Sequence, residues 1–398
     1  MTGDVGRGVR SRSFRALLVA WAVTSVGDGV RAAALPLYTA VSTRDAVAVS
    51  AVAVAEVLPW LLVALPAGAL VDRWRPRSAL ISAHAFRCAV TLVLALLASA
   101  GAAGLPALLV CAFLLSSAET FADSAAQTVL VALAGPEDLE RANGRFVSIE
   151  TLGVEIAGPL AAAALFAWEP ALCFAANALS FGAAACCVAG VPNAAERSSE
   201  RGRLGAEVLA GLRFLTRNPA LRTVVGVVGL TALLTSAVNT VAVLYAVEEL
   251  RMPAAAVPTL LVCTAIGTVL ATPAASRLAR RFGGGRVMIG ALLVLAAGIA
   301  LLGGVRVPAA AWPAYFVMGL GAGTWNVLSA ANRQRLTPRA MMGRVTSAHR
   351  VLAWGLMPLG AGLAGPVAAL TSLGGVILGA AVLVAVVVVL AAPRLRGL

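Results

Sequence analysis

The chain of 398 residues contains no lysine. This absence excludes P-loop nucleotide hydrolysis and Schiff-base chemistry, because both need a lysine amine. Only two histidines are present, His84 and His349, so a histidine-rich metal site is excluded as well. The six cysteines lie in apolar runs without a CxxC pair, which indicates small buried residues and not a disulfide framework or a zinc site. We therefore expect no metal, no cofactor and no enzymatic activity.

Charge is also scarce. Only 12% of the residues are charged and 60% are hydrophobic, whereas about a quarter of a soluble domain is charged. The apolar residues form repeated runs of about 18 residues or more, the length that crosses a bilayer. The sequence therefore predicts an all-α membrane protein with twelve transmembrane helices, at 14–41, 46–71, 78–99, 105–134, 142–167, 170–191, 220–247, 254–276, 286–304, 308–332, 343–371 and 373–392.

The arginines set the orientation of these spans. With a cytoplasmic N-terminus, 26 of the 31 arginines fall in cytoplasmic segments, Arg44, Arg251 and Arg306 lie outside, and Arg31 and Arg87 lie within spans. This bias follows the positive-inside rule and places both termini in the cytoplasm. It also explains the net charge of +13 without a nucleic-acid partner. Arginine in place of every lysine, with abundant alanine, glycine and valine, is typical of a GC-rich bacterial gene, so we expect a bacterial cytoplasmic (inner) membrane.

The longest hydrophilic segment divides the chain into halves. We expect an N-terminal six-helix bundle over 1–191, a cytoplasmic central loop over 192–218 and a C-terminal six-helix bundle over 219–398. Apolar residues recur at helical spacing in the loop, which favours an amphipathic helix on the inner membrane face, although a plain solvated linker remains the alternative. These apolar residues are Leu204, Val208, Leu209, Leu212 and Leu215.

The two halves contain related motifs. GRFVS at 144–148 opens the fifth span, and GRVTS at 343–347 opens the eleventh. Each is followed by a Gly-Pro pair within the membrane, Gly158-Pro159 and Gly365-Pro366. Internal repeats of this kind are typical of secondary transporters, whose sites lie between the halves near the middle of the membrane.

Ionisable residues within spans are functional candidates, because burying a charge in the bilayer is costly. Asp28 lies near the middle of the first span, and Arg31 follows one turn later, so the two can form an ion pair. Glu119 lies near the middle of the fourth span, where Asp123 and Gln127 continue a polar stripe. A desolvated carboxyl group can exchange a proton near neutral pH, which suits proton coupling. A structural Asp28–Arg31 pair and a hydrogen-bonded acid at Glu119 remain the alternatives.

Other polar residues within spans are weaker candidates. Glu56, Glu150 and Glu155 lie in the second and fifth spans. The C-terminal half has no acid within its spans away from an outer helix end. Its neutral groups are candidates for substrate contact, and hydrogen bonding between helices is the alternative. These groups are Thr235, Asn239, Trp325 and Asn326.

A short charged loop resembles a known family. Gly68-x-x-x-Asp72-Arg73-x-x-x-Arg77 is similar to the signature loop of the major facilitator superfamily. LERANGRF at 139–146 and GLRFLTRNPALR at 211–222, with Gly158-Pro159, resemble the drug-exporter branch that contains macrolide and siderophore exporters. The resemblance implies two pseudo-symmetric six-helix bundles and a central cavity lined by spans 1, 4, 7 and 10.

The resemblance also implies roles for particular residues. Asp72 would hold a cytoplasmic gate shut by pairing with Arg145 or with the start of the eleventh span near Met342, where a helix dipole favours a carboxylate. Gly68, Arg73 and Arg77 would belong to the same latch, although topology alone also explains the arginines. The loop after the eighth span lacks an acid, so an acid-based latch is one-sided.

Gly153, Gly158 and Pro159 would form the antiporter-like part of the fifth span. Ala161 and Ala162 stand there in place of the glycines common in antiporters, which weakens the inference of export.

We therefore expect a monomeric, proton-coupled secondary active exporter that moves amphiphilic small molecules by alternating access. The substrate would be a drug, an antibiotic, a siderophore or another natural product, and the partners would be that molecule, protons and the lipid bilayer. Uphill export without ATP needs an ion gradient, and the intramembrane acids favour the proton. The alternatives are an importer or facilitator of the same fold and a membrane receptor that does not transport.

The arginine distribution makes topology testable by cysteine labelling. In a variant with its native cysteines replaced, Ser199→Cys should react with an impermeant maleimide only from the cytoplasmic side. Ser42→Cys should react only from outside, because it precedes an external arginine. Labelling of Ser199→Cys in intact cells would contradict the predicted orientation.

Overall fold

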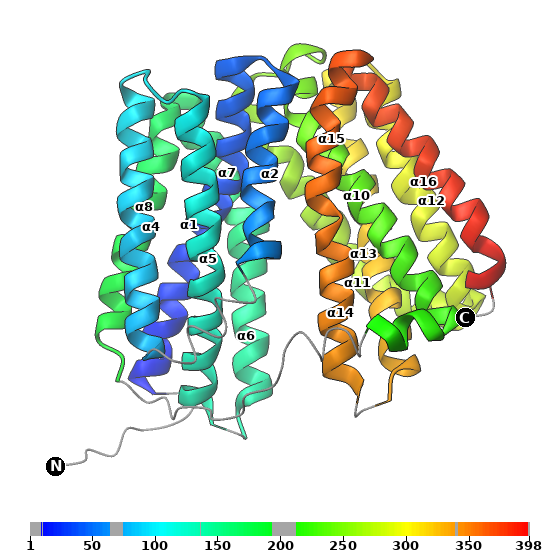
Figure 1. Cartoon of the computed structure of the whole chain (residues 1–398), viewed down its shortest axis with the longest axis horizontal. Helices are drawn as coiled ribbons and strands as arrows, with labels where there is room; N and C mark the ends of the chain where they lie inside the picture. The colour runs from blue at the N-terminus through cyan, green and yellow to red at the C-terminus, as the bar shows by residue number, and fades with distance from the viewer. Residues whose placement is uncertain are drawn as a thin grey trace. The chain divides into compact units, whose positions relative to one another are not determined.

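The computed structural model describes residues 9, 11–63, 75–135, 137–192, 212–338 and 341–396, and all regular secondary structure in these ranges is helical (Figure 1). Nine of the described helices are long and apolar enough to cross a membrane, and Ala46–Leu62 and Met357–Leu370 are shorter apolar helices. Large apolar side chains cover their outer faces; Leu179 is 74% exposed and Leu370 is 86% exposed. Such surfaces are expected of helices that face lipid and not water.

The chain folds into two compact units, one formed by residues 1–38 and 55–200 and the other by 39–54 and 201–398. Both α1 and α2 therefore contribute residues to each unit. The helices that begin in the N-terminal half are α1 (Arg12–Thr43), α2 (Ala46–Leu62), α4 (Pro76–Ser99), α5 (Leu105–Ala134), α6 (Leu139–Leu152), the π-helix η1 (Gly153–Ala157), α7 (Gly158–Trp168) and α8 (Pro170–Ala189).

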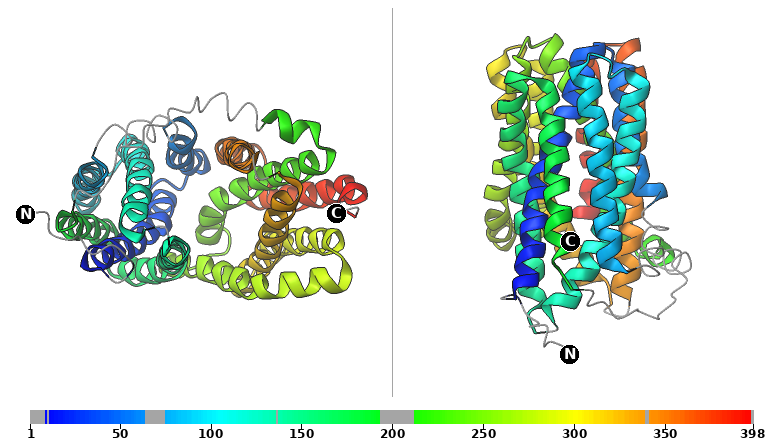
Figure 2. Two further views of the ribbon diagram at one scale, coloured as in Figure 1. Left: turned by 90° about the horizontal axis from the view of Figure 1, so that it is seen from below. Right: turned by 90° about the vertical axis from the view of Figure 1, so that its left-hand side faces the viewer.

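The second unit is built mainly from the C-terminal half, and its helices run alongside one another (Figure 2). α10 packs against α15 and α16, while α13 packs against α11 and α12. The elements are α10 (Pro219–Glu248), η2 (Ala254–Ala256), α11 (Pro258–Phe282), α12 (Gly284–Gly304), η3 (Pro308–Ala310), α13 (Ala311–Leu336), α14 (Met342–Gly355), α15 (Met357–Leu370) and α16 (Leu373–Leu395).

Prolines and polar caps fix where several helices begin. Asn218 accepts hydrogen bonds from the backbone N–H groups of Ala220 and Leu221, at 3.0 and 3.2 Å, and Pro219 is the first residue of α10. Glu169 caps α8 in the same manner, ahead of Pro170. A proline at the first helical position costs no hydrogen bond, because that N–H has no partner within the helix.

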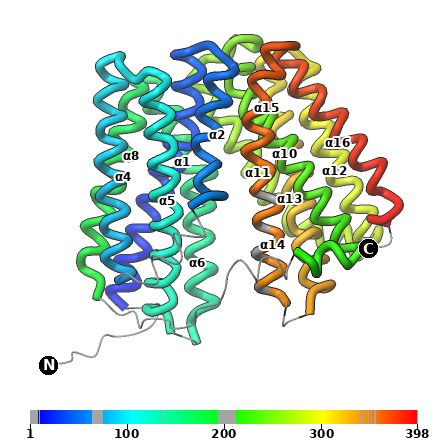
Figure 3. Tube along the Cα trace, in the orientation of Figure 1, coloured from blue at the N-terminus to red at the C-terminus, as the bar shows by residue number. Residues whose placement is uncertain are grey.

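The two spans that carry the repeated motif are both interrupted. The fifth span is α6, the π-turn η1 and α7; Pro159 has no N–H to donate to the Glu155 carbonyl, and the wider turn lies directly before it. The eleventh span is α14 and α15, which follow each other nearly in line on either side of Leu356 (Figure 3). Each span thus has a local irregularity near mid-length, but not at matching residues.

The expected amphipathic helix of the central loop is described only at its end. Leu204, Val208 and Leu209 lie outside the described residues. Residues 212–217 are helical. The side chain of Leu215 is 1% exposed and packs in a cluster of the second unit with Leu221, Val225, Val345 and Ala348.

α1 crosses the fifth span with backbones in close approach. A Cβ atom added at Gly158 would lie 2.6 Å from the carbonyl carbon of Gly29 and 2.8 Å from the carbonyl oxygen of Val26. A Cβ atom added at Gly153 would lie 2.9 Å from the carbonyl carbon of Ser25. These neighbours are backbone atoms, which cannot move aside as a flexible side chain can. Glycine is therefore required at this crossing.

This contact predicts opposite outcomes for two glycines of the same span. Gly158→Ala should lower the unfolding free energy by about 1–3 kcal/mol, because the methyl group forces two helices apart. Gly144→Ala should be neutral or slightly stabilising, because a Cβ atom there has no neighbour within 4 Å and alanine favours a helix. Thermal unfolding of both purified variants measures the difference, and equal stability of the two would contradict the packing argument.

Candidate functional site

Two glycines on α1 flank Asp28 and bring it into the interior of the first unit. A Cβ atom added at Gly27 would lie 2.7 Å from Oδ1 of Asn177 on α8, and one at Gly29 would lie 2.7 Å from the carbonyl oxygen of Val154 on η1. The Gly-Asp-Gly sequence thus lets α1 approach α8 on one side and the fifth span on the other. Asp28 is the only side chain of the triplet, and it faces the remaining direction, toward α4.

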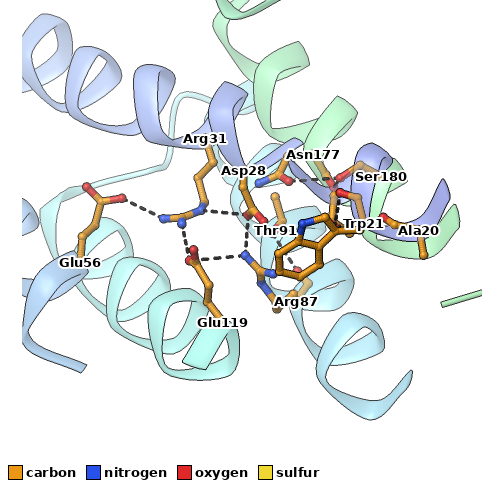
Figure 4. A network of polar contacts seen from close by, with 11 residues as sticks. Ala20, Trp21, Asp28, Arg31, Glu56, Arg87, Thr91, Glu119, Asn177 and Ser180 are labelled. Carbon is orange, nitrogen blue, oxygen red and sulfur yellow. Dashed lines mark hydrogen bonds and ion pairs between the residues drawn. The ribbon is translucent and has the colours of Figure 1, made fainter. Parts of the chain in front are cut away.

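Five charged side chains from four helices form a connected network in this interior (Figure 4). The Arg31 guanidinium lies 2.8 Å from Oε1 of Glu56 and 2.6 Å from Oε2 of Glu119. The Arg87 guanidinium lies 2.5 Å from Oδ1 of Asp28 and 3.5 Å from Oε2 of Glu119. Arg31 Nε and Asp28 are farther apart, at 3.9 Å. The predicted Asp28–Arg31 pair is therefore the longest contact in the network, and Arg87 is the nearer partner of Asp28.

The arginines are the more deeply buried members. The Arg87 side chain is 2% exposed and that of Arg31 is 7% exposed, whereas the three carboxylates are 16–20% exposed. The Arg87 guanidinium also lies over the ring of Phe181, 4.0 Å from its centroid. A cation over an aromatic face is attracted by the ring quadrupole. Arg87 is therefore held from both sides, by a ring and by carboxylates.

The network does not balance its own charge. Two guanidinium groups face three carboxylates, so the network carries one net negative charge when every group is ionised. Asp123, one turn after Glu119 on α5, is half-buried and forms no ion pair among the described residues. An uncompensated charge in a membrane interior is costly, and binding of a proton removes it.

The remaining members of the polar stripe lie farther along α5. Gln127 is exposed, and no hydrogen bond of its side chain occurs within the described ranges. Of the fifth-span acids, Glu150 and Glu155 are both exposed. Of the residues expected from the sequence, Asp28, Arg31 and Glu119 thus lie together in the network. Asp123 lies at its edge, and Gln127 lies outside it.

The residues expected to form the gate latch are described only in part. Gly68, Asp72 and Arg73 lie outside the described residues. Arg77 is the second residue of α4, and its guanidinium donates to the carbonyl oxygens of Val188 and Ala189 at the end of α8. A cation at a helix C-terminus satisfies carbonyls that have no partner within the helix.

Arg145 is exposed on α6 and donates to the carbonyl oxygen of Val9 at 3.5 Å. With Arg141, Gly144, Ser148 and Ile149 it lines an open cavity of about 450 Å³. Both described arginines of the expected latch therefore contact backbone carbonyls of their own unit.

The candidates of the C-terminal half do not form a charged site. Asn239 on α10 and Asn326 on α13 are exposed, and Trp325 is 4% exposed. The Thr235 hydroxyl donates to the carbonyl oxygen of Thr231 within α10, at 2.7 Å. The exposed amides keep hydrogen-bonding capacity for a ligand, whereas Thr235 uses its proton locally.

Sequence reasoning did not include Arg87 and Glu56 among the main candidates. The sequence places Arg87 within a span without assigning it a role, and it makes Glu56 a weaker candidate than Asp28 and Glu119. A usable signal was present, because two arginines in hydrocarbon need carboxylate partners, and Glu56 is the acid of the second span. Among the described residues, no group of three or more His, Cys, Asp or Glu side chains is arranged to hold a metal ion.

One family model matches most of the chain. The model of the Major Facilitator Superfamily matches residues 17–362. No curated protein matches the chain.

Several solved structures have the same fold over nearly their whole length. The nucleoside transporter NupG matches with a TM-score of 0.78 and 14% identity, over 96% of this chain and 98% of its own. A bacterial homologue of the iron transporter ferroportin, in an inward-facing state, matches with a TM-score of 0.69 and 17% identity, over 95% and 98%. A bacterial homologue of the human lysosomal transporter Spinster matches with a TM-score of 0.69 and 14% identity, over 97% and 96%. At these identities the likeness shows the fold alone.

The arrangement around Arg87 predicts a thermodynamic coupling. Arg87→Gln should lower the unfolding free energy by about 3–5 kcal/mol, because it leaves Asp28 and Glu119 short of a buried cation. The double variant Arg87→Gln/Asp28→Asn should recover a large part of this loss, because the network then keeps Arg31 with two carboxylates. Thermal unfolding in one detergent measures all three proteins.

Arg141→Gln is the matched control, because Arg141 pairs with Asp138 at 3.6 Å while its side chain is 79% exposed. An exposed pair contributes about 0–1 kcal/mol. Equal effects of Arg87→Gln and Arg141→Gln, or no recovery in the double variant, would contradict the proposed pairing.

Proposed function

Because the chain belongs to the major facilitator superfamily, we propose that this membrane transporter is a proton-coupled exporter of amphiphilic small molecules. The nine candidate spans and the shorter apolar helices of the described residues are consistent with the twelve-helix, two-bundle architecture of that superfamily, so its substrate is a small molecule and its surroundings are lipid. The proposed site of proton coupling is the charged network of the first unit, and the proposed setting is a bacterial cytoplasmic membrane.

The excess carboxylate of the network is the observation that carries this proposal. Arg31 and Arg87 keep their charges at all physiological pH values, so only the carboxylates can change the net charge. Three carboxylates compete for two cations, at 2.5–3.5 Å for the four shortest contacts. Uptake of one proton neutralises the network, and its release restores a negative charge.

Proton binding affects transport only if it changes the balance between conformations. The network connects α1, α2, α4 and α5, so the charge state of one carboxylate alters the attraction between four helices. At an effective dielectric constant of about 20, a pair of charges about 4 Å apart interacts by about 4 kcal/mol. This is comparable to the energy that shifts a two-state equilibrium from one side to the other, about 5.5 kcal/mol.

The proposal of export rests on features of the fifth span and of the cytoplasmic loops. Gly158 and Pro159 form the crossing with α1 next to Asp28, the same segment whose Gly-Pro pair resembles that of drug exporters. Asp72 is proposed to act in the cytoplasmic latch, and Asn239 and Asn326 are proposed to contact the substrate.

Replacement of the network acids should separate uphill from downhill transport. Asp28→Asn or Glu119→Gln should abolish uphill export, because each replacement removes a carboxylate and frees an arginine to hold the others ionised. At least one of the two should still allow downhill equilibration, because the side-chain shape is nearly kept. The measurement uses proteoliposomes with an imposed pH gradient and a fluorescent amphiphilic dye, chosen from a panel by its altered accumulation in cells that contain the protein.

Asp138→Asn is the control, because within the described ranges the only ion pair of Asp138 is with the exposed Arg141. It should retain both fluxes. Full uphill export by both network variants would contradict proton coupling through this network. Dye accumulation driven into cells, in place of export, would establish the importer reading.

A further inference from the structure

Of the three network carboxylates, Glu56 has the fewest cationic partners. Among the described residues it contacts one guanidinium, that of Arg31 at 2.8 Å. Glu119 contacts both guanidinium groups, at 2.6 and 3.5 Å, and Asp28 contacts both at 2.5 and 3.9 Å. A carboxylate that interacts with two cations loses more attraction on protonation than one that interacts with a single cation. The proton should therefore bind to the carboxylate whose protonation removes the attraction to only one cation.

The partner of Glu56 is itself shared. The Arg31 guanidinium directs one terminal nitrogen to Glu56 and the other to Glu119. When Glu56 takes a proton, Arg31 keeps Glu119 as a close ionised partner and no cation is left unpaired. Protonation of Asp28 would instead remove the shortest contact of Arg87, which is 2% exposed and would keep Glu119, at 3.5 Å, as its nearest ionised partner among the described residues. The two arginines thus tolerate loss of the Glu56 charge more readily than loss of the other two.

We propose that Glu56 on α2 is the carboxylate that takes up and releases the coupled proton. The inference rests on the proposed proton-coupled transport and names the residue within that network. The charged groups that face Glu56 are Arg31 from α1 and Glu119 from α5. The α5 hydroxyl of Ser116 donates to the backbone carbonyl of Glu56 at 2.5 Å, which fixes the α2 backbone but does not compensate the carboxylate.

The position of Glu56 along α2 gives its protonation a mechanical consequence. Pro59 lies three residues later within the helix and cannot donate a hydrogen bond to the Ala55 carbonyl. The Glu56–Arg31 ion pair therefore attaches α2 to α1 next to the point where the hydrogen-bond ladder of α2 is interrupted. Protonation removes that attachment.

Asp123 is the competing proton site, and its geometry argues against coupling. It forms no ion pair in the described part of the chain, so its protonation breaks no contact between helices. A carboxyl group outside every ion pair changes the attraction between helices less on protonation than one that pairs directly with a cation. Glu56 satisfies the requirement that Asp123 does not.

Infrared difference spectroscopy of the reconstituted full chain tests the assignment without a substrate. Stepwise acidification of the wild type from alkaline pH should produce the carbonyl stretch of a protonated buried carboxyl group before the exposed acids titrate. Glu56→Gln should remove this band, and Glu56→Asp should keep a band at a shifted frequency. Asp138→Asn should leave the band unchanged, because Asp138 lies outside the network and pairs with an exposed arginine.

Two further variants test the role of Arg31 by the sign of the effect. Arg31→Gln should move the appearance of the band to higher pH, because the cation that holds Glu56 ionised is gone. Glu119→Gln should move it to lower pH, because Arg31 no longer shares its close contacts with Glu119 and keeps Glu56 at 2.8 Å, with Asp28 farther away at 3.9 Å. Asp123→Asn identifies any second band that belongs to Asp123.

Persistence of the band in Glu56→Gln, or its loss in Glu119→Gln alone, would overturn the assignment. A failure of the proposed function looks different. In that case the Glu56 band and its two shifts are observed, but dye flux does not respond to a pH gradient. If flux is proton-coupled and the band belongs to another residue, only the assignment of Glu56 fails.

Discussion

The buried arginines of the first unit are the constraint around which its polar interior is built. A guanidinium group cannot lose its proton at physiological pH, so Arg31 and Arg87 need carboxylate partners wherever the fold removes them from water. Four helices supply those partners and the side chains that support them, including Phe181 against Arg87. Three carboxylates surround two guanidinium groups. The arrangement that stabilises the arginines therefore also includes one carboxylate in excess, whose charge can change.

Close backbone contact fixes where this network lies within the first unit. The glycines beside Asp28 let α1 approach α8 and the fifth span more closely than any other residue would allow. The π-turn before Pro159 shapes the fifth span at the same crossing. Small residues serve this purpose in membranes because packing, and not exclusion of water, holds transmembrane helices together. Glycine lowers the stability of a helix, but here it allows the close helix packing that positions the Asp28 carboxylate.

The two halves share a repeat but differ in chemistry. The network acids belong to the N-terminal half, while the C-terminal candidates are neutral amides and an aromatic ring. The repeated spans also differ locally, since the fifth contains a π-turn and the eleventh is divided at Leu356. Because the acids lie in one half and the neutral amides in the other, proton coupling is proposed for the N-terminal half and contact with the substrate for the C-terminal half.

The sequence by itself determined the membrane class, the helical fold and most span limits, because hydrophobic length and helix-starting prolines are local properties of the chain. It also identified Asp28, Arg31 and Glu119, because an ionisable residue in an apolar run is evident without coordinates. Tertiary structure alone decided the pairing. Arg87 and Glu56 lie 59 and 28 residues from Asp28 along the chain, and no spacing rule connects them. Only the packing of α1 against its neighbours shows that Asp28 pairs most closely with Arg87, and that Glu56 depends on a single arginine.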